Sequence, residues 1–193
     1  MVSSPAFEVP RRALSGRRPE MAARLLDAAV DEVAATGFEG MTVRLVAARA
    51  GVSVATAYSY FSSKEHLLTS EFWRRMTALP EPVFPKTGGV GRRVELALGP
   101  IALLVADEPE LAAGVTTSLM AHDADVTALR DQMGAVFGHR VSLALGEALP
   151  AAAVPGLTMA FVGALLSAGM GNLDYRDIPA MLGSFAGLLK GAR

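Results

Sequence analysis

The chain has 193 residues, 51% of them apolar, a net charge of −1 and no cysteine. This length suits one or two domains with a sizeable core. The lack of cysteine excludes disulfides, thiolate metal sites and cysteine nucleophiles and fits a reducing cytosol, and the near-neutral charge excludes a protein that binds nucleic acid through a uniformly basic surface.

Charge is unevenly distributed along the chain. Residues 1–18 carry one acid, Glu8, against four arginines, Arg11, Arg12, Arg17 and Arg18. They lack the long apolar run of a signal peptide, so we expect a cytoplasmic protein whose residues 1–18 form a disordered basic arm. The arm is either a solubility tail or a grip on phosphates or the minor groove. From Glu81 onward acids outnumber bases, which is typical of a nucleic-acid-binding head on an acidic body.

The first predicted helix spans residues 19–36. Its apolar residues recur at helical spacing and form one stripe, made of Ala22, Leu25, Leu26, Ala29 and Val33. Pro19 suits the first turn of this helix, and Gly37 is a good stop.

Residues 42–61 predict a helix-turn-helix. Thr42 and Ser53 are suited to cap two short helices, and Gly51 tolerates the positive φ that the turn between them needs. The second helix of such a motif enters the DNA major groove. On this pattern alone, an ordinary helical hairpin with a glycine is an equally good interpretation. A further helix follows, capped by Ser62 or Ser63 and reaching about Leu79.

Residues 80–91 contain three prolines and three glycines, so they form a connector. It separates a helix-turn-helix domain of residues 19–79 from a body of residues 80–193. The body reads as helical over residues 92–106, 107–119, 123–149, 156–170 and 178–190, and no stretch alternates like a strand. The expected fold class is therefore all-α, with a three-helix N-terminal domain and about nine helices in total.

One segment needs comparison with a membrane span. Residues 148–173 carry no charge, and a spanning helix needs about 20 apolar residues. The segment is rich in alanine and glycine, contains Pro150 and Pro155, and lacks an aromatic belt or a basic flank. These features favour a helix buried between subunits.

Residues 42–68 resemble the N-terminal domain of the TetR family of bacterial transcriptional regulators. The runs TVRLVAARAGVS, TAYSYF and SKEHLL agree with the family in order and spacing, and ATGFEGMT before them also fits. The resemblance covers about residues 20–75. It implies a sequence-specific DNA-binding regulator without a cofactor.

The resemblance also implies which residues contact DNA. They lie at the start of the first short helix, on the recognition helix and just after it: Thr42, Arg44, Ser53, Val54, Ala55, Thr56, Tyr58, Ser59, Tyr60 and Lys64. Thr56 can bond a base or a phosphate, and Val54 or Ala55 can touch a thymine methyl. Core packing stays an alternative for Tyr60, as does a solvated surface charge for Lys64. Ala57 replaces a larger aliphatic residue of the family, so we expect room beneath the recognition helix.

The body of family members dimerises and holds a ligand, which implies a homodimer, a palindromic operator and a small hydrophobic effector. The expected dimer interface lies on the last two long helices, at Phe161, Gly163, Ala164, Ser167, Phe185 and Leu189. The expected ligand-binding residues are Trp73, Leu104, Met120 and Phe137. The favoured function is a repressor that its ligand releases from DNA. A ligand-independent repressor, a nucleoid factor or an activator stays open.

The residues do not favour an enzyme. The three histidines, His66, His122 and His139, are scattered without a metal-binding spacing. There is no nucleophile elbow and no strand that would carry a glycine-rich phosphate loop. No catalytic residue, metal or cofactor is therefore expected.

Overall fold

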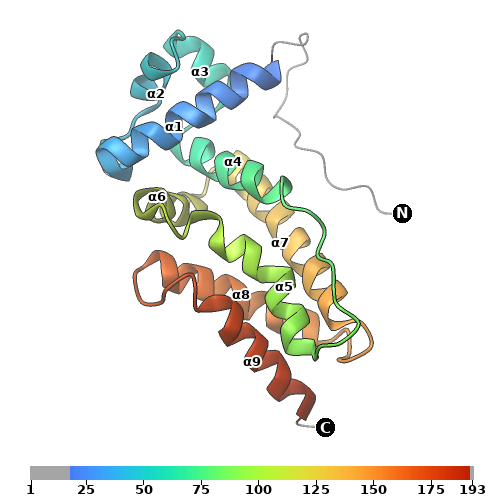
Figure 1. The fold of residues 1–193 in the computed structure, drawn as a ribbon. Helices are drawn as coiled ribbons and strands as arrows, with labels where there is room; N and C mark the ends of the chain where they lie inside the picture. The colour runs from blue at the N-terminus through green and yellow to red at the C-terminus, as the bar shows by residue number, and fades with distance from the viewer. Residues whose placement is uncertain (1–17, 192–193) are drawn as a thin grey trace. The chain divides into compact units, whose positions relative to one another are not determined.

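The computed structural model describes residues 18–191, and over that range the chain is all-α, as expected (Figure 1). The helices are α1 (Arg18–Gly40), α2 (Val43–Arg49), α3 (Val54–Tyr60), α4 (Lys64–Thr77), α5 (Val90–Ala102), α6 (Pro109–Leu119), α7 (Ala124–Leu145), α8 (Ala153–Gly169) and α9 (Ile178–Gly191), with a 3₁₀ turn at Leu103–Val105. The predicted basic arm lies outside the described residues, except that the backbone of Arg18 begins α1. Among the helices described, none is both long and apolar enough to cross a membrane.

The chain divides into two compact units. Within the described range the first comprises residues 18–78 and 108–129, and the second comprises residues 79–107 and 130–191. This differs from the expected division after residue 79, because α6 packs against α1 and α4. Helix α7 contributes to both units.

A glycine explains why α6 joins the first unit. A Cβ at Gly114 would lie 2.8 Å from Cδ1 of Leu68 on α4 and 3.3 Å from Cγ2 of Val33 on α1. Glycine thus lets α6 approach both helices without displacing the Leu68 and Val33 side chains. Leu111 and Val115, on the same face of α6, are buried.

The predicted stripe of α1 is buried throughout. The helical path breaks at Gly37, which has φ 68° and ψ 171°, before a last turn to Gly40. This is the predicted stop, and the positive φ explains why glycine stands there. The break turns the chain so that Thr42 can open α2.

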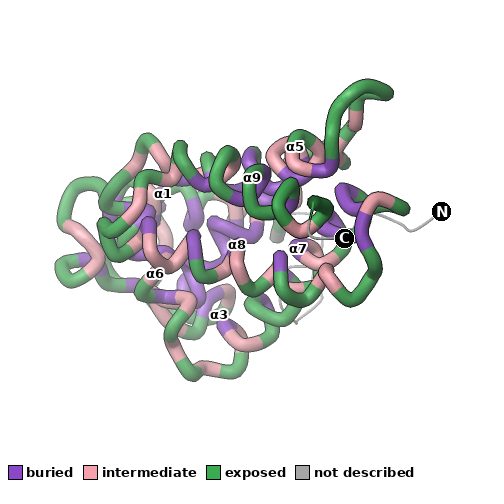
Figure 2. Tube along the Cα trace, turned by 90° about the horizontal axis from the view of Figure 1, so that it is seen from below, coloured by how far each residue is buried: buried purple, intermediate pink, exposed green. Residues whose placement is uncertain are grey.

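In the second unit α5 and α9 run side by side (Figure 1). A Cβ on Gly91 of α5 would collide with the carbonyl oxygen of Gly183 on α9, so the two backbones meet directly. Phe137 of α7 packs edge to face on Phe161 of α8, with ring centroids 5.0 Å apart. Buried and exposed segments alternate along α9 (Figure 2), as in an amphipathic helix with one face outside its own unit.

Candidate DNA-binding surface

Caps and one long-range bond fix helix α2. The hydroxyl of Thr42 accepts a 3.2 Å bond from the Leu45 N–H, which confirms the predicted cap. At the other end Arg24 of α1 donates to the carbonyl of Ala50 at 2.5 Å. Gly51 follows with φ 66°, the left-handed conformation expected at this turn. Two of the candidate contacts, Thr42 and Arg44, are thus held exposed at the start of α2.

Helix α3 turns nearly all its side chains outward. Ser53 caps it, accepting a 3.0 Å bond from the Thr56 N–H, and Ala57 is the one buried residue in the helix. The candidate contacts Ser53, Val54, Ala55, Tyr58 and Ser59 are exposed, and Thr56 is half-buried. Most of the DNA contacts predicted for α3 and its N-cap therefore lie on the outside of the protein. Ala57 is fully covered, so the small side chain lets α3 lie close to the core.

Hydroxyl groups on α3 bond to one another. Oγ of Ser53 and Oγ1 of Thr56 lie 2.8 Å apart in a hydrogen bond. The hydroxyl of Ser59 donates to the carbonyl of Thr56 at 2.7 Å. The hydroxyls of Ser53, Thr56 and Ser59 are thus partly used by bonds within α3 and its N-cap.

The two tyrosines of α3 differ. Tyr58 is 54% exposed, as a phosphate contact needs. Tyr60 is half-buried, with its ring centroid 6.4 Å from that of the buried Phe61. A half-buried ring is compatible with both interpretations of Tyr60, since its hydroxyl can reach out while the ring packs.

Most cationic side chains near this surface have partners within the protein. Besides Arg24, Arg49 bonds the buried carboxylate of Glu32 at 2.8 Å. Lys64 donates to the carbonyl of Phe38 at 2.8 Å and lies 4.0 Å from the centroid of its ring. Arg44 is exposed and has no partner among the residues described. The phosphate contact of Lys64 stays a prediction, and two of its three N–H donors are left for it.

Leu45 is an exposed apolar side chain on α2 that sequence reasoning missed. Leu45 is out of step with the helical spacing of the buried residues Val43, Val46 and Ala47. This spacing could have predicted that Leu45 points outward.

A polar junction lies at the start of α4. Ser63 caps α4 and donates to Asp123 at 2.9 Å, and Ser62 donates to Asp125 at 2.7 Å. Nδ1 of the buried His66 accepts from the Ser62 N–H at 3.2 Å and lies 3.5 Å from Asp125. These bonds tie the chain just after α3 to the start of α7.

Burial lowers the pKa of His66, while the charges of Asp125 and Asp123 oppose that shift. Because Nδ1 accepts a bond, the neutral ring carries its proton on Nε2, which is buried without a partner. Burial of the ring therefore disfavours the charged imidazolium at this site.

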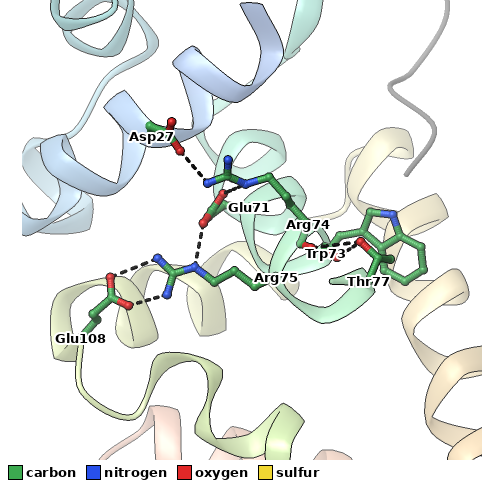
Figure 3. Close-up of polar contacts among 7 residues, drawn as sticks. All are labelled: Asp27, Glu71, Trp73, Arg74, Arg75, Thr77 and Glu108. Carbon is green, nitrogen blue, oxygen red and sulfur yellow. Dashed lines mark hydrogen bonds and ion pairs between the residues drawn. The ribbon is translucent and has the colours of Figure 1, made fainter. Parts of the chain in front are cut away.

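A chain of ion pairs links α1, α4 and the start of α6 (Figure 3). The carboxylate of Glu71, 1% exposed, accepts 2.7 Å bonds from both Arg74 and Arg75. Arg74 also bonds Asp27 at 2.7 Å, and Arg75 forms a two-pronged pair with Glu108. The hydrogen bonds to Glu108, ahead of those to Glu71, raise the pKa of Arg75.

The expected ligand-binding residues fall into both units. Trp73 and Phe137 are buried, and Leu104 is half-buried. Met120 is exposed, at the end of α6. Trp73 and Met120 belong to the first unit, and Leu104 and Phe137 to the second.

Two of the expected dimer contacts are core residues instead. Phe161 and Ala164 are buried, and Phe161 packs on Phe137 inside its own unit. Gly163 and Phe185 are exposed, while Ser167 and Leu189 are half-buried. Helix α8 is apolar on all sides, so periodicity gave no signal for which face points inward.

Large apolar side chains outside that expected set are exposed on α8, at its C-cap and on α9. They are Met159, Met170, Met181 and Leu188, of which Met159 is 73% and Leu188 is 72% exposed. Together with Gly163 and Phe185 they define the outer α8–α9 face.

Residues 25–70 match the family model for bacterial regulatory proteins of the tetR family. The chain is 39% identical to an HTH-type transcriptional regulator of Mycobacterium tuberculosis, over 98% of this chain and 92% of the relative. It is 31% identical to the HTH-type transcriptional repressor KstR of Rhodococcus jostii, over 70% of this chain and 65% of the relative.

Solved structures share the fold. A TetR transcriptional regulator from Rhodococcus sp. RHA1 superposes with a TM-score of 0.69 at 20% identity, covering 90% of this chain and 97% of that one. The regulator FadR from Bacillus subtilis, crystallised with stearoyl-CoA, gives 0.57 at 16% identity, covering 85% and 96%. At these identities the likeness shows the fold alone.

Proposed function

Because this chain belongs to the TetR family of bacterial transcriptional regulators, we propose that it acts as a homodimeric repressor that a small apolar ligand releases from a palindromic operator. The observation that carries DNA recognition is the exposed surface of α2 and α3, with both caps in place. Acting on chromosomal DNA, the protein works in the cytoplasm.

Dimer formation is supported by the outer α8–α9 face. Exposed apolar side chains that gather on two neighbouring helices mark an interaction site. A two-fold pairing through this face presents two copies of α3 to two half-sites, which is what a palindromic operator requires.

Release by a ligand is supported by the relatives and by the position of α6. KstR is a repressor, and the FadR structure holds an acyl-CoA. In this chain α6 packs on α1 and α4 and is tied to α4 through Glu108 and Arg75. A ligand that moves α6 therefore acts directly on the unit that carries α3. In each unit the residues expected to bind the ligand are apolar, Trp73 and Met120 in the first and Leu104 and Phe137 in the second, which favours a hydrophobic effector.

The test begins with selection of genomic fragments by the purified protein at two salt concentrations. Enrichment of one palindromic sequence is expected, and only salt-sensitive, sequence-blind retention would contradict the proposal. Acyl-CoA thioesters and other hydrophobic metabolites are then added to the complex. A compound that raises the melting temperature of the protein and releases the operator is expected. An operator complex that no compound in the panel weakens would instead support a ligand-independent regulator.

A further inference from the structure

The outward face of α3 lacks the side chains that pair with bases through two hydrogen bonds. Arginine and lysine make such pairs with guanine, and asparagine and glutamine make them with adenine. The sequence of α3 is VATAYSY, preceded by Ser53. Placed in the major groove, this helix has no side chain for a two-bond pair with either purine.

The serine and threonine hydroxyls of α3 and its N-cap leave few hydrogens for bonds to a base. Each hydroxyl has one hydrogen, and Ser59 uses its own on the carbonyl of Thr56. Ser53 and Thr56 share a bond between them, so one hydrogen of that pair is left for an outside acceptor. Single hydrogen bonds of this kind discriminate bases weakly.

What remains exposed at the leading turn of α3 is apolar. Val54 is 37% exposed and Ala55 is exposed beside it. The first residues of a recognition helix are those that reach base edges. In the major groove, thymine is the base whose edge carries a methyl group.

We propose that this protein recognises its operator half-sites mainly through thymine methyl groups packed against Val54 and Ala55. The inference rests on the proposed function, in which α3 lies in the major groove. The group recognised is therefore the methyl of a C5-methyl pyrimidine, at the bases that face the first turn of α3. A two-bond pair with guanine falls to Arg44 on α2, which is exposed and has no other partner among the described residues.

The test uses the operator found by fragment selection, with thymines replaced one at a time by deoxyuridine. This change removes the C5-methyl and leaves the hydrogen-bonding edge intact. At the positions facing α3, Kd is expected to rise about fourfold for each methyl removed. Replacing the same T·A pair by 5-methylcytosine·G should restore part of the affinity that cytosine·G loses.

Variants of the protein test whether Val54 causes the rise in Kd that deoxyuridine produces. In Val54→Ala the penalty for deoxyuridine should shrink toward onefold at one position in each half-site, a coupling that a double-mutant cycle measures. Arg44→Ala is the matched control, expected to weaken binding to the thymine and deoxyuridine operators by the same factor. Val54 is exposed, so its truncation leaves the core intact, which circular dichroism and the melting temperature check.

The outcomes separate the two proposals. A selected operator that binds equally well with thymine or deoxyuridine at every position overturns methyl recognition and leaves the repressor proposal standing. A deoxyuridine penalty that persists unchanged in Val54→Ala at every position also overturns it, since no methyl group would then be read by Val54. Failure to select any sequence overturns the proposed function itself.

Discussion

The carboxylate of Glu71 and the guanidinium of Arg75 are joined by a 2.7 Å hydrogen bond within α4, and Arg75 extends the contact to Glu108 at the start of α6. Arg74 makes the matching connection to Asp27 on α1. One buried carboxylate therefore organises the polar contact between three helices of the first unit. These ion pairs add to the apolar packing around Gly114, Leu111 and Val115 that holds α6 against α1 and α4.

Replacing Glu71 by glutamine should lower the free energy of unfolding by about 2 kcal/mol, because it leaves two guanidinium groups without their shared carboxylate. The loss is smaller than for a fully buried pair, since Arg74 and Arg75 are partly exposed and each keeps a second acid. Urea denaturation measures it as a lower midpoint at unchanged slope.

Glu39→Gln provides the control for that substitution, since Glu39 is exposed at the end of α1. It should change the stability by less than about 0.5 kcal/mol. Equal midpoints for the two variants would mean that the ion-pair chain contributes nothing measurable.

His66 should make stability depend on pH. Its pKa in the folded chain is lowered by burial, against the opposing charges of Asp125 and Asp123, while an unfolded imidazole titrates at about 6.5. The unfolded chain therefore binds more protons as the pH falls through that value, so its free energy falls relative to the folded state. The stability is full above about pH 6.5 and decreases as the pH drops toward the lowered pKa.

Urea denaturation at about pH 7.5 and about pH 5.5 tests this, since carboxylates titrate near pH 4 and stay charged over that range. His66→Asn should flatten the decrease. His122→Asn, at an exposed site, should leave it as it is. If the stability of His66→Asn falls with pH as much as that of the unchanged protein, another group causes the pH dependence.

The outer α8–α9 face should hold the dimer together. Leu188→Glu places a charge there twice across a two-fold axis, so the loss of about 3 kcal/mol or more raises the dimer Kd at least about a hundredfold. Sedimentation velocity at micromolar concentration should then show monomer. Val83→Glu is the control, because Val83 is also apolar and 85% exposed but lies ahead of α5, in the predicted connector of residues 80–91. Dimers that survive Leu188→Glu would place the interface elsewhere.

Local chemistry made the helix-turn-helix predictable. The caps at Thr42, Ser53 and Ser63 depend on residues three positions apart, and all three bonds are present. The engagement of Lys64 with the Phe38 carbonyl could not be predicted, because it requires the turn at Gly37 to bring the end of α1 beside α4. Contacts between distant segments leave no trace in local spacing.

Contacts between distant segments also explain why two predictions for residues 80–193 differ from the structure. Phe161 was expected at the dimer interface and lies in the core, because α8 is apolar on every side and its inward face is set by Phe137 of another helix. The assignment of α6 to the first unit likewise depends on how Gly114 fits against Leu68, a contact between residues far apart in sequence.

The contact of Gly114 with Leu68 and Val33 can be tested by comparing two glycine-to-alanine variants. Gly114→Ala puts a methyl 2.8 Å from Cδ1 of Leu68 and 3.3 Å from Cγ2 of Val33, so α6 must move or the side chains must leave their rotamers. Overpacking of this kind costs about 1–3 kcal/mol, which outweighs the helix propensity gained by replacing glycine.

Gly134→Ala, inside α7, meets nothing within 4 Å and should stabilise the protein by about 0.5–1 kcal/mol through helix propensity alone. The two variants make the same chemical change inside a helix, so opposite shifts in melting temperature isolate the contact of α6 with α1 and α4. Two increases would show that α6 has room at Gly114, and the close packing that ties α6 to the DNA-binding helices would then not exist in solution.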